Sequence, residues 1–554
     1  MPSPLFPPFP PPGSGRAAFR RALALIFAAT ATAGSFAVTD RPVGPSPAGV
    51  IAGPYASLLA ASTDLGPARA ANVQLIAELR AASPPAALIG WAGQRELSVR
   101  WRPGDRWAIV EGPPAAVAGA FDVSVRDYRS HRGRVFYASP QQPSIPAPLA
   151  GEVAGLGRIL GYTPHHESLP HITPLETPLD IPLDVPDRGL SPTALLRTYN
   201  AEPLRERGHT GKGVTVLVFA FDGFDQADLD MFAAGFDLPR FTPEVLGGMP
   251  IQRSGEATMD LQTIHAIAPD AKKVLVNARP TVDSDGSYAK IGAMMEEADR
   301  RYPGAVWSFS IGWGCDKLIT AADLVPARSA LVKAIADGTT AFNASGDLAG
   351  LECKGGHEWS APPGPDDVGL DAVASIPEMT DVGGTTLSTD PDGRWLAEQT
   401  WFDVPLSHGT GGGVSNLFPR PPWQARLNLP VPPGRRLTPD IAAVADPTTG
   451  MRIVFRQRYA LGGGTSLSAP VWAGLTALMN EYLSANGGRP IGDLNPLLYE
   501  IAEGARLPAF QDVTVGGNAV DNAAPGYDLV TGLGTPNVDN LAQNLLALQR
   551  RINP

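Results

Sequence analysis

Cysteine and charged residues are scarce in this chain of 554 residues, which has two cysteines and 18% charged residues. The formal net charge is −11, and no basic stripe interleaved with aromatic residues occurs, so the sequence argues against nucleic acid as a partner. Beyond the N-terminal region there is no long hydrophobic run, so nothing predicts a membrane anchor. We therefore expect a protein that acts neither on nucleic acid nor in a membrane.

Glycine and proline, by contrast, are plentiful. There are 60 glycines and 57 prolines, which predict many turns and long loops. The hydrophobic fraction of 44% is ordinary for a globular protein, and the length allows more than one domain and a large core. The acidic composition suits an acidic or extracellular setting.

The N-terminus is typical of a secretory signal. Three arginines precede the apolar run 22–29 and small residues follow it, so we predict cleavage after Ala33 or Ala37 and assign residues 1–37 to the signal. A run this short does not span a bilayer comfortably. We therefore expect a secreted, extracellular protein.

An exported protein meets an oxidising environment, in which paired cysteines form disulfides. We therefore expect a disulfide between Cys315 and Cys353. In the chain-entropy model such a bridge stabilises the fold by about 3–4 kcal/mol. Two free buried thiols are the alternative.

The first part of the mature chain has the pattern of a small α+β domain, which we place at residues 40–165. Leucine and alanine recur at helical spacing over 56–82, and short strand patterns follow at 107–112 and 133–137. The segment 166–189 is rich in proline, aspartate and threonine, a composition that predicts an exposed linker. Exposed linkers are preferred sites of proteolysis.

A second pattern begins near residue 190 and continues to the end of the chain. The near-continuous apolar run 213–221 is typical of a buried parallel strand, and strand patterns at 273–277, 305–310 and 340–344 alternate with helical ones. We therefore predict a doubly wound α/β domain over 190–554. In such folds, ligands bind beyond the carboxyl ends of the strands.

A candidate nucleophile lies in a glycine-rich turn late in the chain. Three glycines precede Thr465 and Ser466, and Pro470 is expected in the first turn of the helix that follows. This arrangement can expose a serine at a helix N-terminus beside free backbone N–H groups. An ordinary glycine turn is the alternative.

Carboxyl groups are the candidate partners of this serine. A helix is predicted from Ser254, as N-cap, to Pro269, and it carries Glu256 and Asp260 on one face. Close together in a cleft, two such carboxyls are pushed apart in pKa, so that one keeps a proton. Asp347 lies in a turn after a predicted strand, where a protonated carboxyl could donate to an oxyanion. A solvated acidic face and an ordinary turn aspartate are the alternatives.

Together, these motifs resemble the sedolisins, a family of serine-carboxyl peptidases that are secreted acid proteases with a subtilisin-like fold. Glu256 and Asp260 match the Glu-x-x-x-Asp helix of the family. Asp347 matches its Ser-Gly-Asp aspartate, and Ser466 matches its Gly-Thr-Ser serine. Further matches follow the family order along the chain: 310–314, 382–386, 411–415, 439–441 and 526–528. Leu348-Ala349 replaces the Ser-Gly that often follows the aspartate, so the local loop is expected to differ.

The resemblance implies a mechanism. Ser466 would attack the peptide carbonyl, Glu256 would be the general base, and Asp260 would orient Glu256. Asp347 and the Ser466 backbone N–H would stabilise the oxyanion. Because a carboxylate base has a pKa near 4 and Asp347 must be neutral, activity is expected to peak in acid.

The resemblance also implies how substrates bind. The strand that carries Ser308, Ser310 and Gly312 would pair with the backbone of a protein or peptide substrate. The likeness covers most of the chain, and it gives 40–165 the role of an inhibitory propeptide domain of the pro-kumamolisin type. The activation cut would lie in the linker 166–189. We therefore expect a zymogen that is inhibited by its own propeptide and acts as a monomer.

A metal site is implied near the C-terminus, again by the resemblance. One Ca²⁺ ion would be held by the side chains of Asp512 and Asp528 and by the carbonyls of Val513, Ala524 and Gly526. Carboxylates and carbonyls are the oxygen ligands that Ca²⁺ prefers. Without the resemblance, these residues are ordinary turns.

Other functions remain open at this point. A tripeptidyl-peptidase-type exopeptidase of the same family would have one end of its cleft blocked. A non-catalytic binding protein on the same scaffold would lack catalytic groups, whereas all four are present. A neutral subtilisin-like protease would have a different pH profile.

Overall fold

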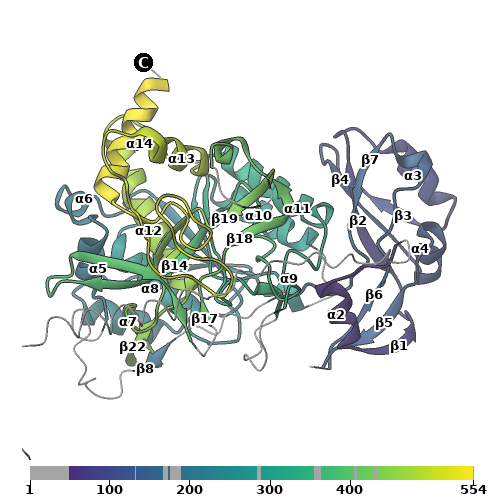
Figure 1. Cartoon of the computed structure of the whole chain (residues 1–554), viewed down its shortest axis with the longest axis horizontal. Helices are drawn as coiled ribbons and strands as arrows, with labels where there is room; N and C mark the ends of the chain where they lie inside the picture. Colours follow the sequence, from purple (N-terminus) through teal and green to yellow (C-terminus); the bar gives the residue numbers. More distant parts are fainter. Residues whose placement is uncertain are drawn as a thin grey trace, which may run out of the picture. The chain divides into compact units, whose positions relative to one another are not determined.

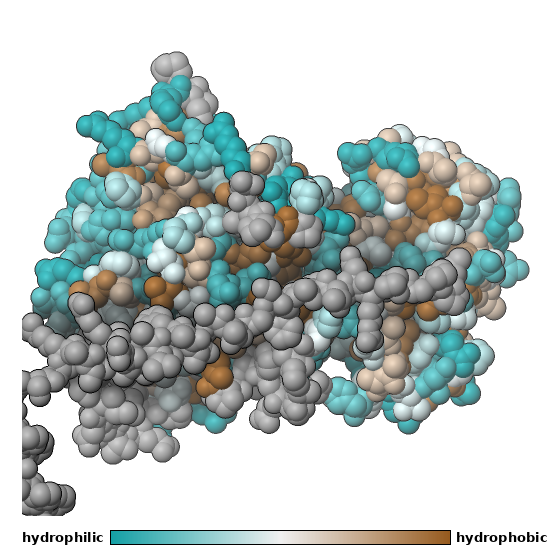
Figure 2. All heavy atoms as spheres, viewed as in Figure 1, coloured by the Kyte–Doolittle hydropathy of each residue, from teal (hydrophilic) through white to brown (hydrophobic). Residues whose placement is uncertain are grey.

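The computed structural model describes residues 49–552, except residues 132 and 432 and the segments 166–171, 175–188, 284–287, 355–363, 405–407 and 428–430 (Figure 1). The predicted signal at 1–37 and most of the predicted linker at 166–189 lie outside the described residues. Within the described part, no helix combines the length and the apolar character needed to cross a membrane. The face drawn in Figure 2 is largely hydrophilic, with hydrophobic side chains in small groups.

Residues 49–165 form an α+β module, drawn in purple and blue in Figure 1. Its antiparallel sheets have the strand orders β3-β4-β2-β7 and β1-β5-β6. The elements are α2 (Pro54–Ala60), β1 (Thr63–Pro67), β2 (Val73–Leu79), α3 (Ala86–Gly93), β3 (Ser98–Arg100), β4 (Trp107–Gly112), α4 (Pro114–Phe121), β5 (Arg126–Arg129), β6 (Val135–Ala138) and β7 (Val153–Leu156). Leu75, Trp91 and Phe121 belong to an apolar cluster built from this module.

The helix predicted over 56–82 is wrong. The helix α2 ends at Ala60, and the strands β1 and β2 occupy most of the remaining range. Gly66 and Pro67 are poor helix residues, and the burial along β2 largely alternates from residue to residue, which is the period of a strand. The alanine-rich composition therefore favoured helix, while the tertiary packing of β2 between β4 and β7 decided for strand.

The rest of the chain is organised by a larger sheet with the order β10-β11-β9-β12-β13-β14-β15. Its strands are β9 (Thr215–Ala220), β10 (Glu244–Leu246), β11 (Lys272–Asn277), β12 (Val306–Phe309), β13 (Thr340–Ala344), β14 (Thr380–Thr389) and β15 (Trp395–Thr400). All neighbours are parallel except β14 and β15, and β20 (Ile441–Val444) adds a further parallel pairing to β14. The predicted strands and the doubly wound α/β class are confirmed.

Helices cover both faces of this sheet. Along β9, Val216 and Val218 belong to one apolar cluster, whereas Leu217 and Phe219 belong to another, as the alternation of a strand requires. The first cluster includes residues of α8 (Glu256–Ile267), α12 (Thr465–Ala485) and α14 (Val538–Ile552); the second includes residues of α10 (Ala289–Arg301) and α11 (Ala321–Ala336). Glu256, Asp260 and Ser466 therefore come from helices on one face, whereas Asp347 lies in a loop after β13.

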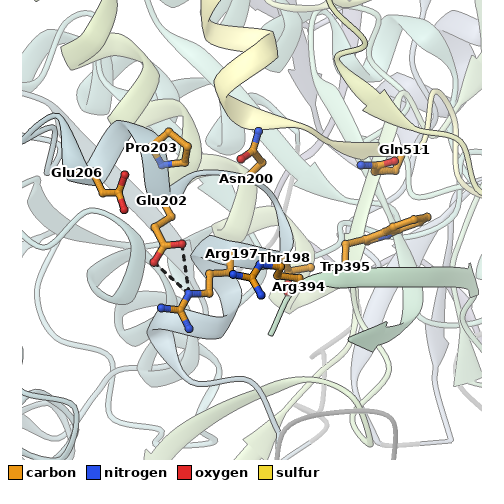
Figure 3. Close-up of a pocket in the computed structure, with 9 residues that line it drawn as sticks. All are labelled: Arg197, Thr198, Asn200, Glu202, Pro203, Glu206, Arg394, Trp395 and Gln511. Carbon is orange, nitrogen blue, oxygen red and sulfur yellow. Dashed lines mark hydrogen bonds and ion pairs between the residues drawn. The ribbon is translucent and has the colours of Figure 1, made fainter. Parts of the chain in front are cut away.

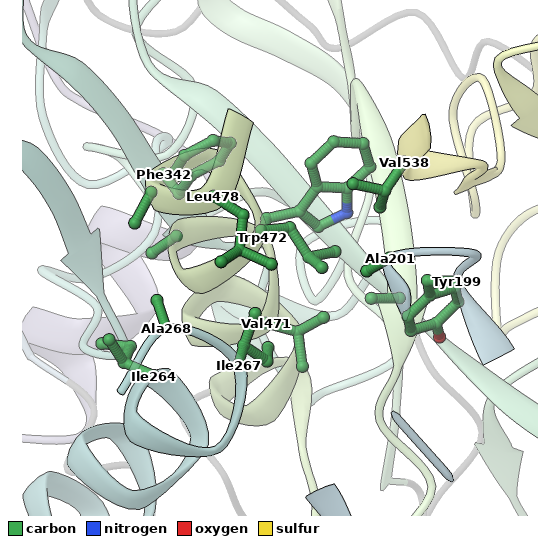
Figure 4. Close-up of a cluster of buried hydrophobic side chains, with 14 of the residues drawn as sticks. Tyr199, Ala201, Ile264, Ile267, Ala268, Phe342, Val471, Trp472, Leu478 and Val538 are labelled. Carbon is green, nitrogen blue, oxygen red and sulfur yellow. The ribbon is translucent and has the colours of Figure 1, made fainter. Parts of the chain in front are cut away.

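The packing of α12 fixes the position of the candidate serine. Figure 4 shows Val471 of α12 beside Ile267 of α8, and Trp472 of α12 and Phe342 of β13 belong to the same apolar cluster. The Trp472 ring stacks on Phe342 at 6.2 Å between centroids, and its Nε1 donates to the carbonyl of Ala442. Truncating a buried aromatic of this kind costs about 3–5 kcal/mol.

Shorter elements complete the described part of this region. They are β8 (Thr173–Pro174), α5 (Pro192–Thr198), α6 (Glu202–Glu206), α7 (Gln226–Gly235), α9 (Pro280–Asp283), β16 (Phe402–Asp403), β17 (His408–Gly409), β18 (Gly413–Pro419), β19 (Arg435–Thr438), β21 (Met451–Phe455), β22 (Arg458–Gly462), α13 (Asn495–Gly504), β23 (Phe510–Gln511) and β24 (Thr535–Pro536).

Candidate active site

Ser466 is the second residue of α12, directly after the glycine turn that leaves β22. Gly464 has φ 87°, which only glycine adopts without strain, and a Cβ on Gly463 would lie 2.6 Å from the carbonyl oxygen of Ala445. The turn therefore needs its glycines. The expectation that Pro470 lies in the first turn is wrong, because α12 begins at Thr465 and Pro470 lies inside the helix.

Glu256 opens the helix α8 and Asp260 follows one turn later. Both are buried, with 3% and 0% of their surface exposed, so the alternative of a solvated acidic face is excluded. The helix starts at Glu256 with Gly255 as its N-cap and ends at Ile267, slightly inside the predicted bounds. Ser254 is therefore not the N-cap.

The N-cap residue Gly255 has no side chain that could accept a hydrogen bond from the first turn of α8, and the Asp222 side chain takes this role from another segment. Its carboxylate accepts hydrogen bonds from the backbone N–H groups of Ser254, Gly255, Glu256 and Ala257, at 2.9–3.2 Å, and from the Ser254 hydroxyl at 2.6 Å. Asp222 follows β9, so the end of a central strand holds the start of α8. No local sequence pattern indicates these partners, which lie 32 to 35 positions from Asp222.

Burial is the largest influence on the two helix carboxyls. It raises the pKa of Glu256 well above its usual range, and the negative charges of Asp260, Asp222 and Asp347 raise it further. Burial also raises the pKa of Asp260 well above its usual range. Two carboxyls with raised pKa values cannot both ionise easily, so at least one of them keeps its proton over the acid range.

Ser466 is the hydroxyl that faces this pair. The Ser466 hydroxyl is close enough to Glu256 to lower the pKa of its carboxyl, whereas burial raises that pKa. Neither Glu256 oxygen has a partner within hydrogen-bond limits, and the Ser466 hydroxyl instead donates to the Ser310 carbonyl at 3.4 Å. Loose contacts of this kind are common in active sites without substrate and tighten when one binds.

Asp347 lies next to the start of α12. Its Oδ1 accepts hydrogen bonds from the Thr465 backbone N–H at 2.8 Å and from the Thr465 hydroxyl at 2.7 Å. Its loop is paired with β17, because Gly409 N–H donates to the Asp347 carbonyl and Ala349 N–H donates to the Gly409 carbonyl. The structure thus brings Asp347 to the residue that precedes Ser466.

Glu352 lies beneath the Asp347 loop and was missed from the sequence. Its Oε1 accepts from the Leu348 N–H at 3.0 Å, and a Cβ on Gly346 would lie 2.2 Å from the same oxygen. Burial raises the pKa of Glu352 well above its usual range, and Asp347 raises it further. The buried Glu352 carboxyl therefore fixes the backbone of Leu348, the first of the two residues that replace the Ser-Gly of the family.

The disulfide between Cys315 and Cys353 is present, with 4.9 Å between the Cα atoms, and this prediction is confirmed. Cys315 lies beyond β12, and Cys353 directly follows Glu352. The bridge therefore links the segment beyond β12 to the loop that carries Asp347.

The three predicted substrate-binding residues differ in position. Ser308 is inside β12 and its register pairs it with Val218 on one side and Phe342 on the other, so both backbone edges are occupied. Ser310 and Gly312 lie beyond the end of β12, and the Ser310 carbonyl accepts from the Ser466 hydroxyl. We therefore restrict the prediction of substrate pairing to the latter two.

The predicted calcium residues cluster around one turn. The Asp512 Oδ2 accepts from the Gly526 N–H at 2.9 Å, and the Asp528 Oδ2 accepts from the Ala524 N–H at 3.0 Å. Val513 follows Asp512 and is buried. Two carboxylates and a carbonyl-rich turn are a donor set that fits Ca²⁺.

Of the eight histidines in the chain, His265 lies on α8 and His408 lies on β17, the strand that pairs with the Asp347 loop. His265 is fully buried, stacks on Phe241 at 3.8 Å, and has its Nε2 2.7 Å from the Pro239 carbonyl. His408 is on β17, where its backbone pairs with Asp403. The neighbours that shift the pKa of Glu256 are carboxyl groups and a hydroxyl.

A surface pocket of about 260 Å³ lies apart from these groups (Figure 3). Arg197 and Glu202 form an ion pair on one side of it, and Trp395 lies on the opposite side in this view. None of the catalytic candidates is among the residues that line it. Its mixed charges identify no ligand.

The comparisons with known proteins agree with one another, although no family model matches the chain. Kumamolisin from Bacillus sp. (strain MN-32) is 30% identical over 474 residues, which cover 81% of this chain and 80% of that protein. Sedolisin from Pseudomonas sp. (strain 101) is 26% identical over 453 residues, covering 78% and 74%. Human tripeptidyl-peptidase 1 is 29% identical over 389 residues, covering 65% and 64%.

A solved structure shows the same fold. Pseudomonas sedolisin, described as a serine-carboxyl proteinase in complex with two molecules of pseudo-iodotyrostatin, superposes with a TM-score of 0.55 and 26% identity. The match covers 65% of this chain and 98% of that one. The parallel sheet, the buried carboxyl pair and the extent of the kumamolisin match point in one direction: this chain belongs to the sedolisin family of serine peptidases.

Proposed function

We propose that the protein is an acid-acting serine-carboxyl endopeptidase with Ser466 as nucleophile and Glu256 as general base. The observation that carries this proposal is the buried carboxyl pair at the start of α8, which lies near a serine at the start of α12. Residues with shifted pKa values beside a candidate nucleophile are typical of active sites.

The proposed reaction begins when the Ser466 oxygen attacks the scissile carbonyl carbon and its proton passes to Glu256. Asp347 and the Ser466 backbone N–H donate to the oxyanion of the tetrahedral intermediate. Glu256 then returns the proton to the leaving amine, the C–N bond breaks, and water hydrolyses the acyl-enzyme by the same route. Asp260 orients Glu256 and shares a proton with it.

The proposed base and oxyanion donor require acid conditions. Glu256 must lose its proton while Asp347 keeps its own, and both are carboxyl groups. We therefore expect a bell-shaped pH profile with its maximum below neutrality.

We also propose that residues 40–165 inhibit the enzyme until they are removed. The guanidinium of Arg102 pairs with Glu296 of α10 at 2.6 Å, and the backbone N–H of Arg158 donates to both oxygens of Asp323 of α11 at 3.1 Å. These contacts support docking of the N-terminal module on the peptidase part.

The described piece of the linker supports self-inhibition. In β8, Thr173 and Pro174 pair antiparallel with Leu461 and Ala460 of β22, the strand that leads to Ser466. A Cβ on Gly255, which precedes Glu256, would lie 2.4 Å from the Cδ1 of Ile172. A linker segment thus lies against the residues that precede both the proposed base and the nucleophile.

An endopeptidase is favoured because this segment is internal to the chain. A site that accepts an internal segment suits cleavage inside polypeptides. A tripeptidyl-peptidase-type exopeptidase is the alternative, since relatives with that name match 65% of the chain. Protein substrates distinguish the two, because an exopeptidase releases tripeptides and an endopeptidase releases fragments of many lengths.

Calcium, secretion and a monomeric state complete the proposal. Asp512, Asp528 and the carbonyls of Val513, Ala524 and Gly526 would hold one Ca²⁺ ion, which would tie the C-terminal loops together. The signal-like N-terminus and the disulfide support secretion. Size-exclusion chromatography of the mature enzyme tests the monomer.

The decisive experiment is digestion of a denatured protein from pH 2 to pH 8 with the wild type, Ser466→Ala and Glu256→Gln. We expect cleavage in acid by the wild type alone. Activity that peaks at neutral pH, or that survives Glu256→Gln, would refute the carboxyl base. Binding without cleavage by the wild type would identify a non-catalytic scaffold.

A further inference from the structure

The proline inside α12 leaves one backbone acceptor of the helix without its usual donor. In a regular helix, the N–H of residue 470 would donate to the C=O of residue 466. Pro470 has no N–H, so the carbonyl of the proposed nucleophile is released from the helix ladder. This carbonyl is buried with Ser466 and therefore needs another donor.

Ser310 supplies that donor from the segment beyond β12. Its hydroxyl lies 3.1 Å from the Ser466 carbonyl oxygen and 3.0 Å from the Asp260 Oδ1. Ser310 has 0% of its surface exposed, so water does not compete for these contacts. A single buried hydroxyl thus bridges the peptide of the nucleophile and the carboxyl pair of α8.

Resting on the proposed function, we propose that Ser310 is a positioning residue for the reaction. Its hydroxyl holds the Asp260 carboxyl and the Ser466 peptide in a fixed relation, so that Glu256 stays aligned with the nucleophile. Pro470 makes this bridge possible, because it keeps the Ser466 carbonyl available to Ser310. The sequence assigned to Ser310 only a backbone role in binding substrate.

The bridge has a consequence for the pH profile. A hydroxyl has one proton, which Ser310 shares between Asp260 and the Ser466 carbonyl. Donation to Asp260 stabilises the singly ionised carboxyl pair, which lowers the pKa of Asp260. The other charged groups that face the pair are Asp222, which raises the pKa of both carboxyls, and Asp347, which raises that of Glu256.

The test measures kcat and KM from pH 2 to pH 7 on an internally quenched peptide, after activation of the full chain. Losing a hydrogen bond to a charged group costs roughly tenfold. For Ser310→Ala we expect kcat about tenfold lower, KM within about twofold, and an acid limb moved up by about one pH unit. Ser310→Thr keeps the hydroxyl and should restore the acid limb.

Pro470→Ala tests the same bridge from the other side and removes no buried polar group. The new N–H competes for the Ser466 carbonyl, so the Ser310 proton goes to Asp260 and the acid limb should move down. Ser468→Ala is the matched control. It is another fully buried serine of α12, and its hydroxyl donates only to the carbonyls of Ala443 and Val444. It should lower the melting temperature and leave the acid limb in place.

The outcomes separate this inference from the proposed function. Wild-type cleavage in acid, with the acid limb of Ser310→Ala unchanged or shifted equally in Ser468→Ala, overturns the positioning role alone. If Ser310→Ala does not fold, an unmoved acid limb in Pro470→Ala overturns it as well. A wild type without Ser466-dependent cleavage in acid overturns both proposals.

Discussion

A buried pair of acidic side chains lies at one end of α8, and a buried pair of basic side chains lies near its other end. At its N-terminal end are Glu256 and Asp260, whose pKa values burial raises well above the usual range. Near its C-terminal end, His265 faces Lys273 of β11, whose Nζ lies 3.0 Å from its Nδ1. There, burial lowers the pKa of Lys273 to about 7 and, with the Lys273 charge, lowers that of His265 to about 3.

The comparison shows that a perturbed pKa does not by itself mark an active site. Burial disfavours the charged form at both ends. The basic pair is closed off by the Phe241 ring and by the Pro269 carbonyl, to which Lys273 donates at 2.6 Å. The acidic pair, in contrast, faces a serine hydroxyl at a helix N-terminus. The difference in function therefore comes from what each pair contacts.

The largest expected effect is on activity at the acidic end. Glu256→Gln keeps the size of the side chain but cannot accept a proton, so kcat should fall by roughly 10²–10⁴-fold. Because the wild-type carboxyl has a raised pKa, its ionisation costs stability at neutral pH, and the variant should melt at a higher temperature at pH 7. Peptide hydrolysis and calorimetry measure both. A variant with more than a tenth of wild-type kcat contradicts the comparison.

The basic end should affect stability and leave catalysis intact. The folded-state pKa of Lys273 is about 7, below its ordinary value. The contribution of neutral Lys273 to the free energy of unfolding is therefore fully present above the unfolded pKa and is lost as pH falls through 7. Lys273→Met removes this acid penalty and should raise the melting temperature at pH 5 by several degrees, with kcat within about twofold of wild type. A lower melting temperature at pH 5, or a large loss of kcat, would count against this role.

Asp371, which lies outside α8, is a further buried carboxyl whose pKa is raised although it belongs to no acidic pair on a helix. Burial raises the pKa of Asp371 to about 7, although its oxygens accept from the N–H groups of Trp313, Val373 and Ala374. Its stabilising contribution is complete below the unfolded pKa near 4 and is lost as pH rises through 7. The melting temperature should therefore fall between pH 4 and pH 7.5, and Asp371→Asn should flatten this slope. An unchanged slope contradicts the prediction.

The smallest expected effect concerns the acidic groups of the proposed calcium site. Removing Ca²⁺ with a chelator should lower the melting temperature by a few degrees, because a ligand that binds only the folded state stabilises it by mass action. Asp528→Asn should lower the melting temperature and abolish most of the chelator effect. The same response to chelator in wild type and variant would argue for a different site.

Local sequence patterns predicted much of the fold. The continuous apolar run that became β9 and the strand patterns that became β11, β12 and β13 were found because each strand is buried on both faces. The same approach failed over 56–82, where alanine-rich composition favoured helix and sheet pairing decided otherwise. Pro470 was misplaced by one turn, since glycine and proline signals do not fix a helix boundary to the residue.

Much of the candidate site came from motifs, and the rest depended on distant contacts. Glu256, Asp260, Asp347 and Ser466 lie in short segments with recognisable spacing, whereas Asp222, Glu352 and the bridging hydroxyl of Ser310 act through hydrogen bonds to other segments. Asp222 reaches residues more than 30 positions away, and Ser310 reaches Ser466 across 156 positions. No local pattern encodes such pairings.

The sequence by itself determined the alternation of strands and helices, the glycine turn before Ser466 and the chemical types of the four proposed catalytic groups, because periodicity and turn chemistry are properties of neighbouring residues. Only the tertiary structure decided that the carboxyl pair is buried and that Asp222 caps α8. It also decided that the Ser310 hydroxyl donates to the Ser466 carbonyl, which has no helical donor because residue 470 is proline. Burial and long-range hydrogen bonds exist only once segments far apart in the chain are packed together, and they are what separate a reactive carboxyl pair from an acidic surface.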